Sequence, residues 1–359
     1  MQDLYRVVVF AVALVGAAIL LPELLSILLA VLVAVLLALP LAAAASRLQR
    51  YGVPRVVGVV LTLAAMAVAV GLLLALILPP LVDQFTNVVN GLPGAVNEVQ
   101  KGLHSIGIHT KGAGQAVQDF VRRYQSDPGE LLGPVTDVGL SIAGTVVLFL
   151  IVIVNAVFMA TNPRPLVNGL LSLFPSADQD TVGQTLERIR RSWLAWIAGV
   201  VIDGIVLGFL LWIGMEIIGL QYALTFAVLS ALLTVIPNYG SIISAIPPIL
   251  FALQDSPTKA LLVLIVYIVV NQFEGNVLYP LIMSRAVSLH PAVVAIGVIV
   301  VAALFGVIGL FVSVPILSLS AILVDELRIK PLQRREAKEA ELQHAELTGQ
   351  IEPPATIER

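Results

Sequence analysis

Long apolar runs separated by short polar breaks dominate the chain and predict a series of membrane-spanning helices. A helix needs about 20 consecutive apolar residues to cross a bilayer. The pattern therefore predicts an all-α integral membrane protein with about eight hydrophobic segments, the first two of which form a hairpin around Pro22 and Glu23. The segments cover residues 7–21, 24–45, 56–79, 138–160, 193–217, 222–253, 260–270 and 292–323.

Two of these segments are too long for a single crossing. Residues 222–253 and 292–323 would each form a helix about 48 Å long, whereas the hydrocarbon core is about 30 Å thick. Each is interrupted near its centre, the first by Pro237–Gly240 and the second by Gly306 and Gly309. We expect two re-entrant hairpins, with one tilted and kinked helix as the alternative in each case. Each hairpin follows a span, which predicts an inverted repeat in the C-terminal half.

Amphipathic stretches separate the apolar segments and suggest a division into five parts. Residues 81–124 and 166–193 carry apolar residues on one helical face, which predicts helices on the membrane surface or at subunit contacts. The five parts are N-terminal spans (1–79), extracytoplasmic amphipathic helices (80–136), a span with a cytoplasmic amphipathic helix (137–192), a transport core of two span-plus-hairpin units (193–325) and a charged cytoplasmic tail (326–359).

A polar cluster at residues 271–276 is the strongest candidate for a functional site. It closes an apolar run that begins at Ala260, so its side chains should lie within the membrane. A carboxylate at the bilayer centre costs about 2.5–3.5 kcal/mol on insertion scales, which makes Glu274 expensive to keep without a partner or a task. On a helix, Asn271 and Glu274 share one face, and Gln272 and Asn276 share another. The cluster is either a coordination or proton site or a polar contact that holds helices together.

Other polar groups in the C-terminal half are candidates to complete this site. Asp203 is the second carboxylate expected within a span, although it could pair within its own helix. Asn238, Ser241 and Ser244 lie at the predicted tip of the first hairpin. We expect His290 to be buried near the mouth of the second hairpin, with either a structural hydrogen bond or a titrating role.

Composition and charge narrow the class of protein. Hydrophobic residues make up 58% of the chain and charged residues 12%, against about 25% charged in an ordinary soluble domain. Cysteine is absent, which excludes disulfides and thiolate chemistry, and the net charge of -3 is too small to indicate a nucleic-acid partner. The sequence contains no phosphate-binding loop, zinc-protease pair or nucleophile elbow, so we expect no enzyme, cofactor or metal centre. Arg188, Arg190 and Arg191 fit the positive-inside signal, and both termini are expected in the cytoplasm.

Three sequence blocks resemble the autoinducer-2 exporter family of bacterial membrane transporters. They are I-P-N-Y-G-S-I-I-S-A-I-P (236–247), N-Q-F-E-G-N-V-L-Y-P-L-I-M-S-R-A-V-S-L-H-P (271–291) and F-G-V-I-G-L-F-V-S-V-P (305–315). The resemblance implies a bacterial inner or plasma membrane protein, a homo-oligomer with a pentamer favoured, and export of small polar signals such as the quorum-sensing molecule autoinducer-2. Other members are assigned to Na⁺/H⁺ exchange. Asn271 departs from the pattern, where Gln is more common.

These observations favour a secondary transporter that works by alternating access. Glu274 would carry the coupling proton or cation, Asn271, Gln272 and Asn276 would face the solute, and the lipid bilayer is the expected environment. A Na⁺/H⁺ antiporter is one alternative. A channel is another, and a scaffold that binds partners through its tail is a third.

Overall fold

The computed structural model describes residues 2–105, 142–237, 239–278 and 290–347 of the 359-residue chain. Within these ranges every regular element is a helix, and five helices are long and apolar enough to cross a membrane, or six if the bent pair α5 and α6 counts as one span. The all-α membrane class is therefore confirmed. The elements are α1 (Gln2–Gln49), α2 (Arg55–Ser105), α5 (Ile142–Thr161), α6 (Pro163–Leu171), α7 (Gln179–Ile217), α8 (Ala223–Leu233), α9 (Gly240–Asp255), α10 (Pro257–Phe273), α12 (Pro291–Val324) and α13 (Lys330–Leu347), with π-helical turns η1 (Glu274–Leu278) and η2 (Asp325–Ile329).

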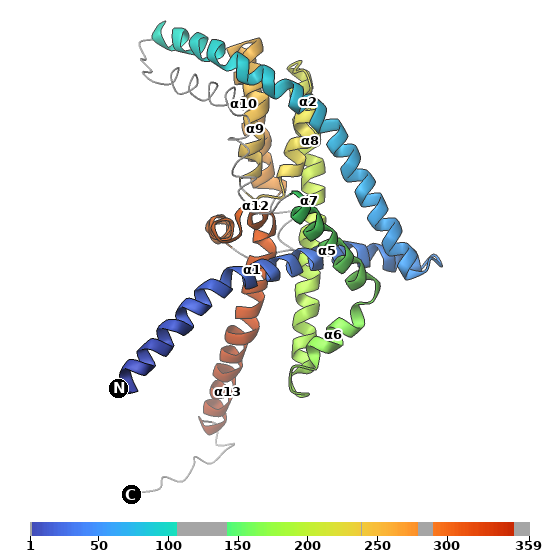
Figure 1. Ribbon diagram of the computed structural model, residues 1–359, viewed down its shortest axis with the longest axis vertical. Helices are drawn as coiled ribbons and strands as arrows, with labels where there is room; N and C mark the ends of the chain where they lie inside the picture. Colours follow the sequence, from blue (N-terminus) through green and yellow to red (C-terminus); the bar gives the residue numbers. More distant parts are fainter. Residues whose placement is uncertain (1, 106–141, 238, 279–289, 348–359) are drawn as a thin grey trace, which may run out of the picture.

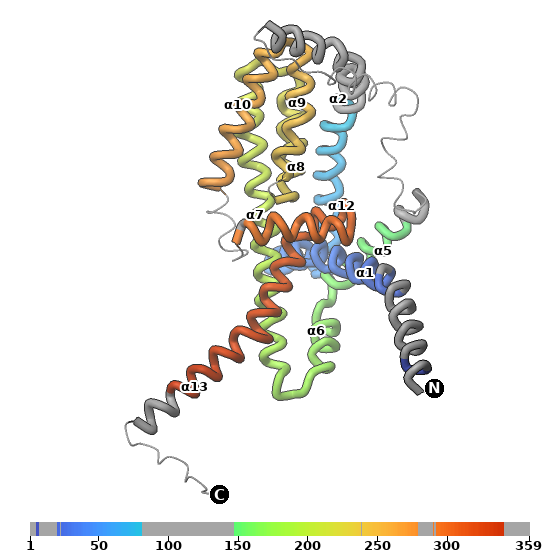
Figure 2. Tube along the Cα trace, turned by 90° about the vertical axis from the view of Figure 1, so that its left-hand side faces the viewer, coloured from blue at the N-terminus to red at the C-terminus, as the bar shows by residue number. Residues whose placement is uncertain are grey.

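Helix α7 is the axis of the molecule. It runs along the long direction, and α8, α9 and α10 gather around one half of it (Figure 1). Near the middle, α1 and α12 cross this bundle, while α6 and α13 lie toward the other end (Figure 2). Helices α7 to α10 thus form a bundle, and α7 continues beyond it toward the other end of the molecule (Figure 1).

Close packing of α7 on α8 uses residues without bulky side chains. A Cβ atom on Gly204 would lie 2.7 Å from the Ala231 carbonyl oxygen, and one on Gly208 would lie 3.0 Å from the Ala231 Cβ. Gly204 and Gly208 are one turn apart, as are Ala227 and Ala231. Small residues at this spacing let the backbones of membrane helices approach closely, and the resulting van der Waals packing holds the helices together.

A second unit is formed by α1, α2 and α5. Its core consists of Ala38, Leu41, Ala45, Val59, Ala156 and Ala160. The Arg55 guanidinium donates from Nε and Nη2 to the Ala160 carbonyl, at 3.0 and 2.9 Å. This carbonyl is in the last turn of α5, where helical donors run out. Arg55 therefore caps α5 just before the chain bends by 86° into α6.

The predicted interruptions of the two overlong segments are present. Helix α8 ends at Leu233 and α9 begins at Gly240, and residues 234–237 and 239 between them are not helical. In α12 the backbone departs from helical geometry at Gly306, with φ 61° and ψ −147°, a region that favours glycine. Val298 and Val314, on opposite sides of Gly306, belong to one apolar cluster with Trp196 of α7. That both segments enter a membrane from one side, as opposed repeats, stays a prediction.

Two proline positions behave differently from the prediction. Helix α1 continues through Pro22 and Glu23, so the predicted hairpin over residues 7–45 is wrong. Helix α2 likewise continues through Pro79 and Pro80 to Ser105, although its apolar span ends at Pro80. Proline removes one helical donor and crowds the preceding turn, which a helix can absorb by bending when the surrounding residues favour helix. Part of the charged tail forms helix α13, whereas residues 106–141 and 348–359 lie outside the described residues.

Candidate functional site

Two buried helical stripes lead to the candidate site. On α10 the stripe consists of Ala260, Val263, Tyr267 and Val270, and the next position on the same face is Glu274. On α7 it consists of Met215, Leu211 and Leu207, and the next position is Asp203. The apolar members of both stripes belong to one core cluster. Because residues spaced by three or four share a helical face, both carboxylates continue this core at the same end.

Asp203 is the most deeply buried acidic side chain described. It is 4% exposed, and its Oδ1 has no hydrogen-bond partner among the described residues. Glu274 is half-buried and lies close enough to Asp203 for their negative charges to interact. Two carboxylates in apolar surroundings are costly unless a proton, a cation or a donor compensates them. The arrangement therefore suits a site that takes up positive charge.

Asn271 belongs to the same inner face as Glu274. Its Oδ1 is buried and has no hydrogen-bond partner among the described residues. Gln272 and Asn276 are exposed on the other face, where the Asn276 amide donates to the Gln272 carbonyl at 2.8 Å. The predicted division into two faces is confirmed. The structure places Asn271 on the same face as Glu274 and leaves Gln272 and Asn276 exposed on the other.

Glu274 opens a π-helical turn, η1, directly after α10. A π turn shifts the hydrogen-bond register by one residue, and such turns frequently occur at functional sites. The Glu274 carboxylate therefore lies at the end of the buried α10 stripe, at the point where the backbone hydrogen bonds change from the α-helical to the π-helical pattern. The chain from residue 279 to residue 289 lies outside the described residues.

Two of the predicted hairpin-tip residues, Ser241 and Ser244, belong to the first turns of α9. Ser244 is fully buried, Ser241 is half-buried, and the Ser244 hydroxyl donates to the Ser241 carbonyl at 3.0 Å. Asn238 lies outside the described residues. Sequence reasoning missed Tyr267, whose hydroxyl lies 2.7 Å from the Ser230 hydroxyl and 3.3 Å from the Ser244 carbonyl oxygen. Its position on the Glu274 stripe, two turns earlier, was the available signal.

His290 is not buried, and that expectation is wrong. The side chain is exposed, and its Nδ1 accepts from the Ala292 N–H at 3.2 Å. The first N–H groups of a helix have no helical acceptor, and the backbone at His290 is extended just before Pro291. His290 therefore serves as the N-cap of α12. Among the described residues, no three His, Asp or Glu side chains form a candidate metal site.

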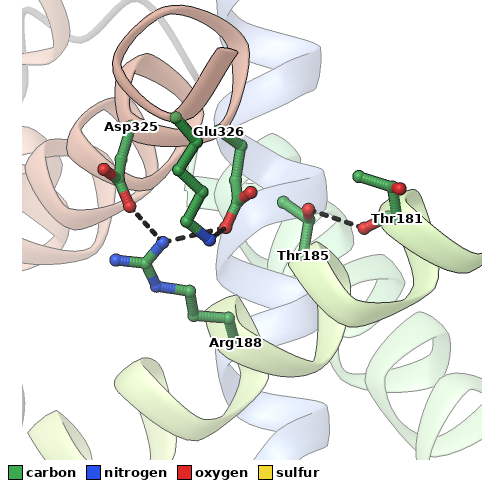
Figure 3. A network of polar contacts seen from close by, with 6 residues as sticks. Thr181, Thr185, Arg188, Asp325 and Glu326 are labelled. Atoms are coloured by element: carbon green, nitrogen blue, oxygen red, sulfur yellow. Dashed lines mark hydrogen bonds and ion pairs between the residues drawn. The ribbon is translucent and has the colours of Figure 1, made fainter. Parts of the chain in front are cut away.

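An ionic cluster joins α7 to the end of α12. Arg188 pairs with Asp325 and donates to Glu326 at 2.9 Å, and Lys330 also pairs with Glu326 (Figure 3). The sequence identified Arg188 only as a positive-inside residue, because its partners lie far away along the chain. One turn further, the Trp193 indole donates to the Ser318 hydroxyl at 3.0 Å and the Pro315 carbonyl at 3.2 Å. These contacts connect α7, which carries Asp203, to α12 and to the π turn η2 that precedes α13.

Comparison with known proteins agrees with this membrane architecture. A protein of Bacillus subtilis (strain 168), provisionally named transport protein YueF, is 30% identical over 153 residues, 42% of each chain. A protein of Escherichia coli (strain K12), provisionally named transport protein YhhT, is 35% identical over 116 residues, 32% of this chain and 33% of that protein. The chain thus matches less than half the length of each of these two relatives.

A longer match extends to a relative with a named cargo. The AI-2 transport protein TqsA of Escherichia coli (strain K12) is 25% identical over 270 residues, which cover 74% of this chain and 76% of that protein. Residues 7–329 match the sequence profile described as AI-2E family transporter. This match includes the carboxylate pair, both interrupted segments and nearly all of the apolar helices. The chain therefore belongs to the AI-2E family of membrane transporters.

Proposed function

We propose that this protein is a secondary transporter that exports a small polar solute, of the autoinducer-2 type, and couples export to a proton or another cation. The observation that carries the proposal is the electrostatic interaction of Asp203 on α7 with Glu274 at the end of the α10 stripe, together with the buried Asn271 oxygen on the same face as Glu274. Two of these groups carry buried oxygens without hydrogen-bond partners among the described residues. A site for a positive charge at membrane depth is what coupled transport requires.

Each of the three residues has a distinct role in this proposal. Glu274 is half-buried and begins a π turn, so it is the group that exchanges its proton or cation with the solute pathway. Asp203 is fully buried and holds the second negative charge, which raises the attraction of the pair for a cation. Asn271 supplies a neutral oxygen that binds either the cation or a donor group of the solute.

The interrupted segments provide the moving parts. Helices that break at depth are tolerated where they line a cavity, and alternating access opens such a cavity to one side at a time. We propose that α8 and α9 form one such gate and the two arms of α12 form the other. The name of TqsA supports an autoinducer-2-like cargo, and the apolar helices support a multi-pass membrane protein. We propose that it lies in the bacterial plasma membrane with both termini cytoplasmic.

A homo-oligomer, with a pentamer favoured, completes the proposal. Many large apolar side chains are exposed on α2 and α5, such as Leu72 and Phe158, at 67% and 70%. Lipid covers such surfaces in a monomer, and neighbouring subunits share them in an oligomer. The tail helix α13 is charged and exposed, so it fits the aqueous side of the assembly.

The test uses purified protein in proteoliposomes with an imposed pH gradient. Glu274→Gln keeps the shape of the side chain but cannot release a proton, so we expect gradient-driven solute flux to fall at least about tenfold while the oligomer stays intact. Glu216→Gln, at an exposed carboxylate of α7, is the matched control and should transport normally. Coupled flux at the wild-type level in Glu274→Gln would remove Glu274 from the mechanism. Single-channel currents in place of saturable counterflow would indicate a channel. A cellular function of the protein that persists in a variant without solute flux would indicate a scaffold.

A Na⁺/H⁺ antiporter is the second candidate, and the composition of the site favours it specifically. Carboxylate and amide oxygens are ligands that hard cations prefer. Sodium efflux driven by a pH gradient with no organic solute present would support this assignment. The same Glu274→Gln and Glu216→Gln pair applies, because both functions need a titrating carboxylate at the site.

A further inference from the structure

The two prolines of α9 leave one backbone carbonyl without its usual donors. In an α-helix the Ser244 carbonyl accepts from the N–H of residue 248, and in a tighter 3₁₀ turn it accepts from residue 247. Both positions are proline, which has no backbone N–H. Ser244 and Pro248 are buried, so water does not replace the missing donor readily. A buried carbonyl in this situation needs a partner from elsewhere in the fold.

The Tyr267 hydroxyl of α10 is that partner. It lies 3.3 Å from the Ser244 carbonyl oxygen, and Tyr267 is 1% exposed. The same hydroxyl lies 2.7 Å from the hydroxyl of Ser230, which is fully buried on α8. One phenol thus contacts both arms of the hairpin formed by α8 and α9, on either side of its break.

The protons of this cluster allow two arrangements. In one, Ser230 donates to Tyr267, and Tyr267 donates to the Ser244 carbonyl. In the other, Tyr267 donates to Ser230, which donates to the Phe226 carbonyl 2.9 Å away, and the Ser244 carbonyl loses its donor. Each hydroxyl has only one proton, so the cluster cannot make all of these bonds at once. The arm that carries Ser244 is therefore held in the first arrangement and released in the second.

We propose that Tyr267 is a positioning residue that ties the α8–α9 hairpin to α10 through the carbonyl that Pro247 and Pro248 leave free. Tyr267 and Glu274 lie on one stripe of α10, so the tie fixes the hairpin relative to the carboxylate pair. It also joins the two span-plus-hairpin units, because Ser244 belongs to the first and Tyr267 to the second. The consequence for gating rests on the proposed transport function, whereas the tie itself is testable without transport.

The test measures opening of the hairpin by thiol labelling in a chain that has no native cysteine. Thr234→Cys places a near-isosteric thiol at a buried position beside the break. Labelling of a buried thiol reports the population of the opened state. Tyr267→Phe keeps the ring but removes the hydroxyl that donates to the Ser244 carbonyl, so we expect labelling about tenfold faster than in the Thr234→Cys parent. Tyr222→Phe, at the other end of the same hairpin, is the matched control and should leave the rate within about twofold.

Rescue by a second substitution separates a positioning role from general packing. Pro248→Ala restores a backbone N–H that can donate to the Ser244 carbonyl. In the Pro248→Ala background, Tyr267→Phe should therefore change the labelling rate by less than about twofold. If Tyr267→Phe alone does not assemble, the double variant should assemble, and failure of both overturns the proposal. An equal acceleration with and without Pro248→Ala also overturns it, as does wild-type labelling in Tyr267→Phe. If Glu274→Gln loses coupled flux but leaves the labelling rate of Thr234→Cys unchanged, the transport site and the Tyr267 tie act independently of each other.

Discussion

Gly297 and Leu317 lie against each other although they are twenty positions apart in the same helical element. A Cβ atom on Gly297 would come within 2.6 Å of both Cδ atoms of Leu317. In a straight helix these positions would be separated by about 30 Å. The left-handed backbone at Gly306 reverses the chain between them, so α12 is two helices packed on each other. This contact is the feature that distinguishes a folded-back segment from one kinked span.

Cross-linking tests this contact directly. We expect a disulfide to form readily between cysteines in the double variant Gly297→Cys and Leu317→Cys, because their Cα atoms lie within reach only if α12 folds back. The control pair is Ile299→Cys with Leu317→Cys, since Ile299 is exposed on the other side of the same arm. Absence of the cross-link from correctly assembled protein, measured by mobility after oxidation, would support a single kinked helix.

Close packing of α7 on α8 predicts a cost for adding one methyl group. In Gly204→Ala the new Cβ would meet a backbone oxygen of Ala231, which cannot rotate away. We expect the free energy of unfolding to fall by about 1–3 kcal/mol, despite the higher helix propensity of alanine. Gly71→Ala is the control, because nothing described lies within 4 Å of a Cβ at that position. Thermal melting of the purified protein distinguishes the two, and equal melting temperatures would contradict the packing argument.

Local patterns predicted the parts of the fold that depend on helical periodicity and on chain breaks. The three-residue spacing of Asn271 and Glu274 placed them on one face, and the structure has them there. The breaks near Pro237 and at Gly306 also follow from residue type, because these residues interrupt helices or permit reversal. The assignment of Glu274 as a carrier stays a prediction.

Long-range partners could not be predicted in the same way. Arg188 and Asp325 are 137 positions apart, and no local pattern relates them. The course of α1 through Pro22 depends on the helix around the proline and not on the proline alone. Tyr267 had a sequence signal that was harder to see: adjacent prolines in an apolar helix leave a carbonyl that requires a donor, and a tyrosine in a neighbouring apolar helix can supply it.

The ionic cluster at the end of α12 predicts an effect on the tail helix. Arg188→Gln removes the contacts of α7 with Asp325 and Glu326, and we expect α13 to become more sensitive to limited trypsin digestion. The stability change should be about 1 kcal/mol or less and should shrink at high salt, because the side chains are partly exposed. Arg190→Gln breaks only a contact with Glu187 inside α7, so it should leave digestion of α13 unchanged. Equal sensitivity of both variants would argue against a link between α7 and the tail.

The proposed orientation predicts which side of the membrane Asp255 faces. Asp255 is exposed at the junction of α9 and α10, where Ser256 caps α10 by accepting from the Lys259 N–H at 3.2 Å. In intact cells, a membrane-impermeant thiol reagent should label Asp255→Cys from outside. Arg191→Cys, at an exposed position expected in the cytoplasm, should react only after the cells are permeabilised. If Asp255→Cys is labelled only after permeabilisation, the α8–α9 hairpin faces the cytoplasm and the proposed orientation is wrong.

A substitution of Asp203 should affect stability and transport in opposite directions. Its carboxylate is buried beside a second negative charge, and its Oδ1 has no hydrogen-bond partner among the described residues. Such a group is kept at a cost, so Asp203→Asn, which has the same shape and no charge, should raise the melting temperature of the assembled protein. Because the entropy of unfolding grows with chain length, a gain of 1 kcal/mol corresponds to about 1–2 °C for a chain of this size, which is measurable.

The same Asp203→Asn variant should lose at least about tenfold in cation-coupled flux, because one of the two charges that attract the cation is removed. Asp180→Asn, at an exposed position in the first turn of α7, is the control and should alter neither property appreciably. A purely structural Asp203 predicts the opposite result: lower melting temperature with coupling retained. Higher stability together with lost coupling is the expected mark of a residue that is retained for transport at the expense of the fold.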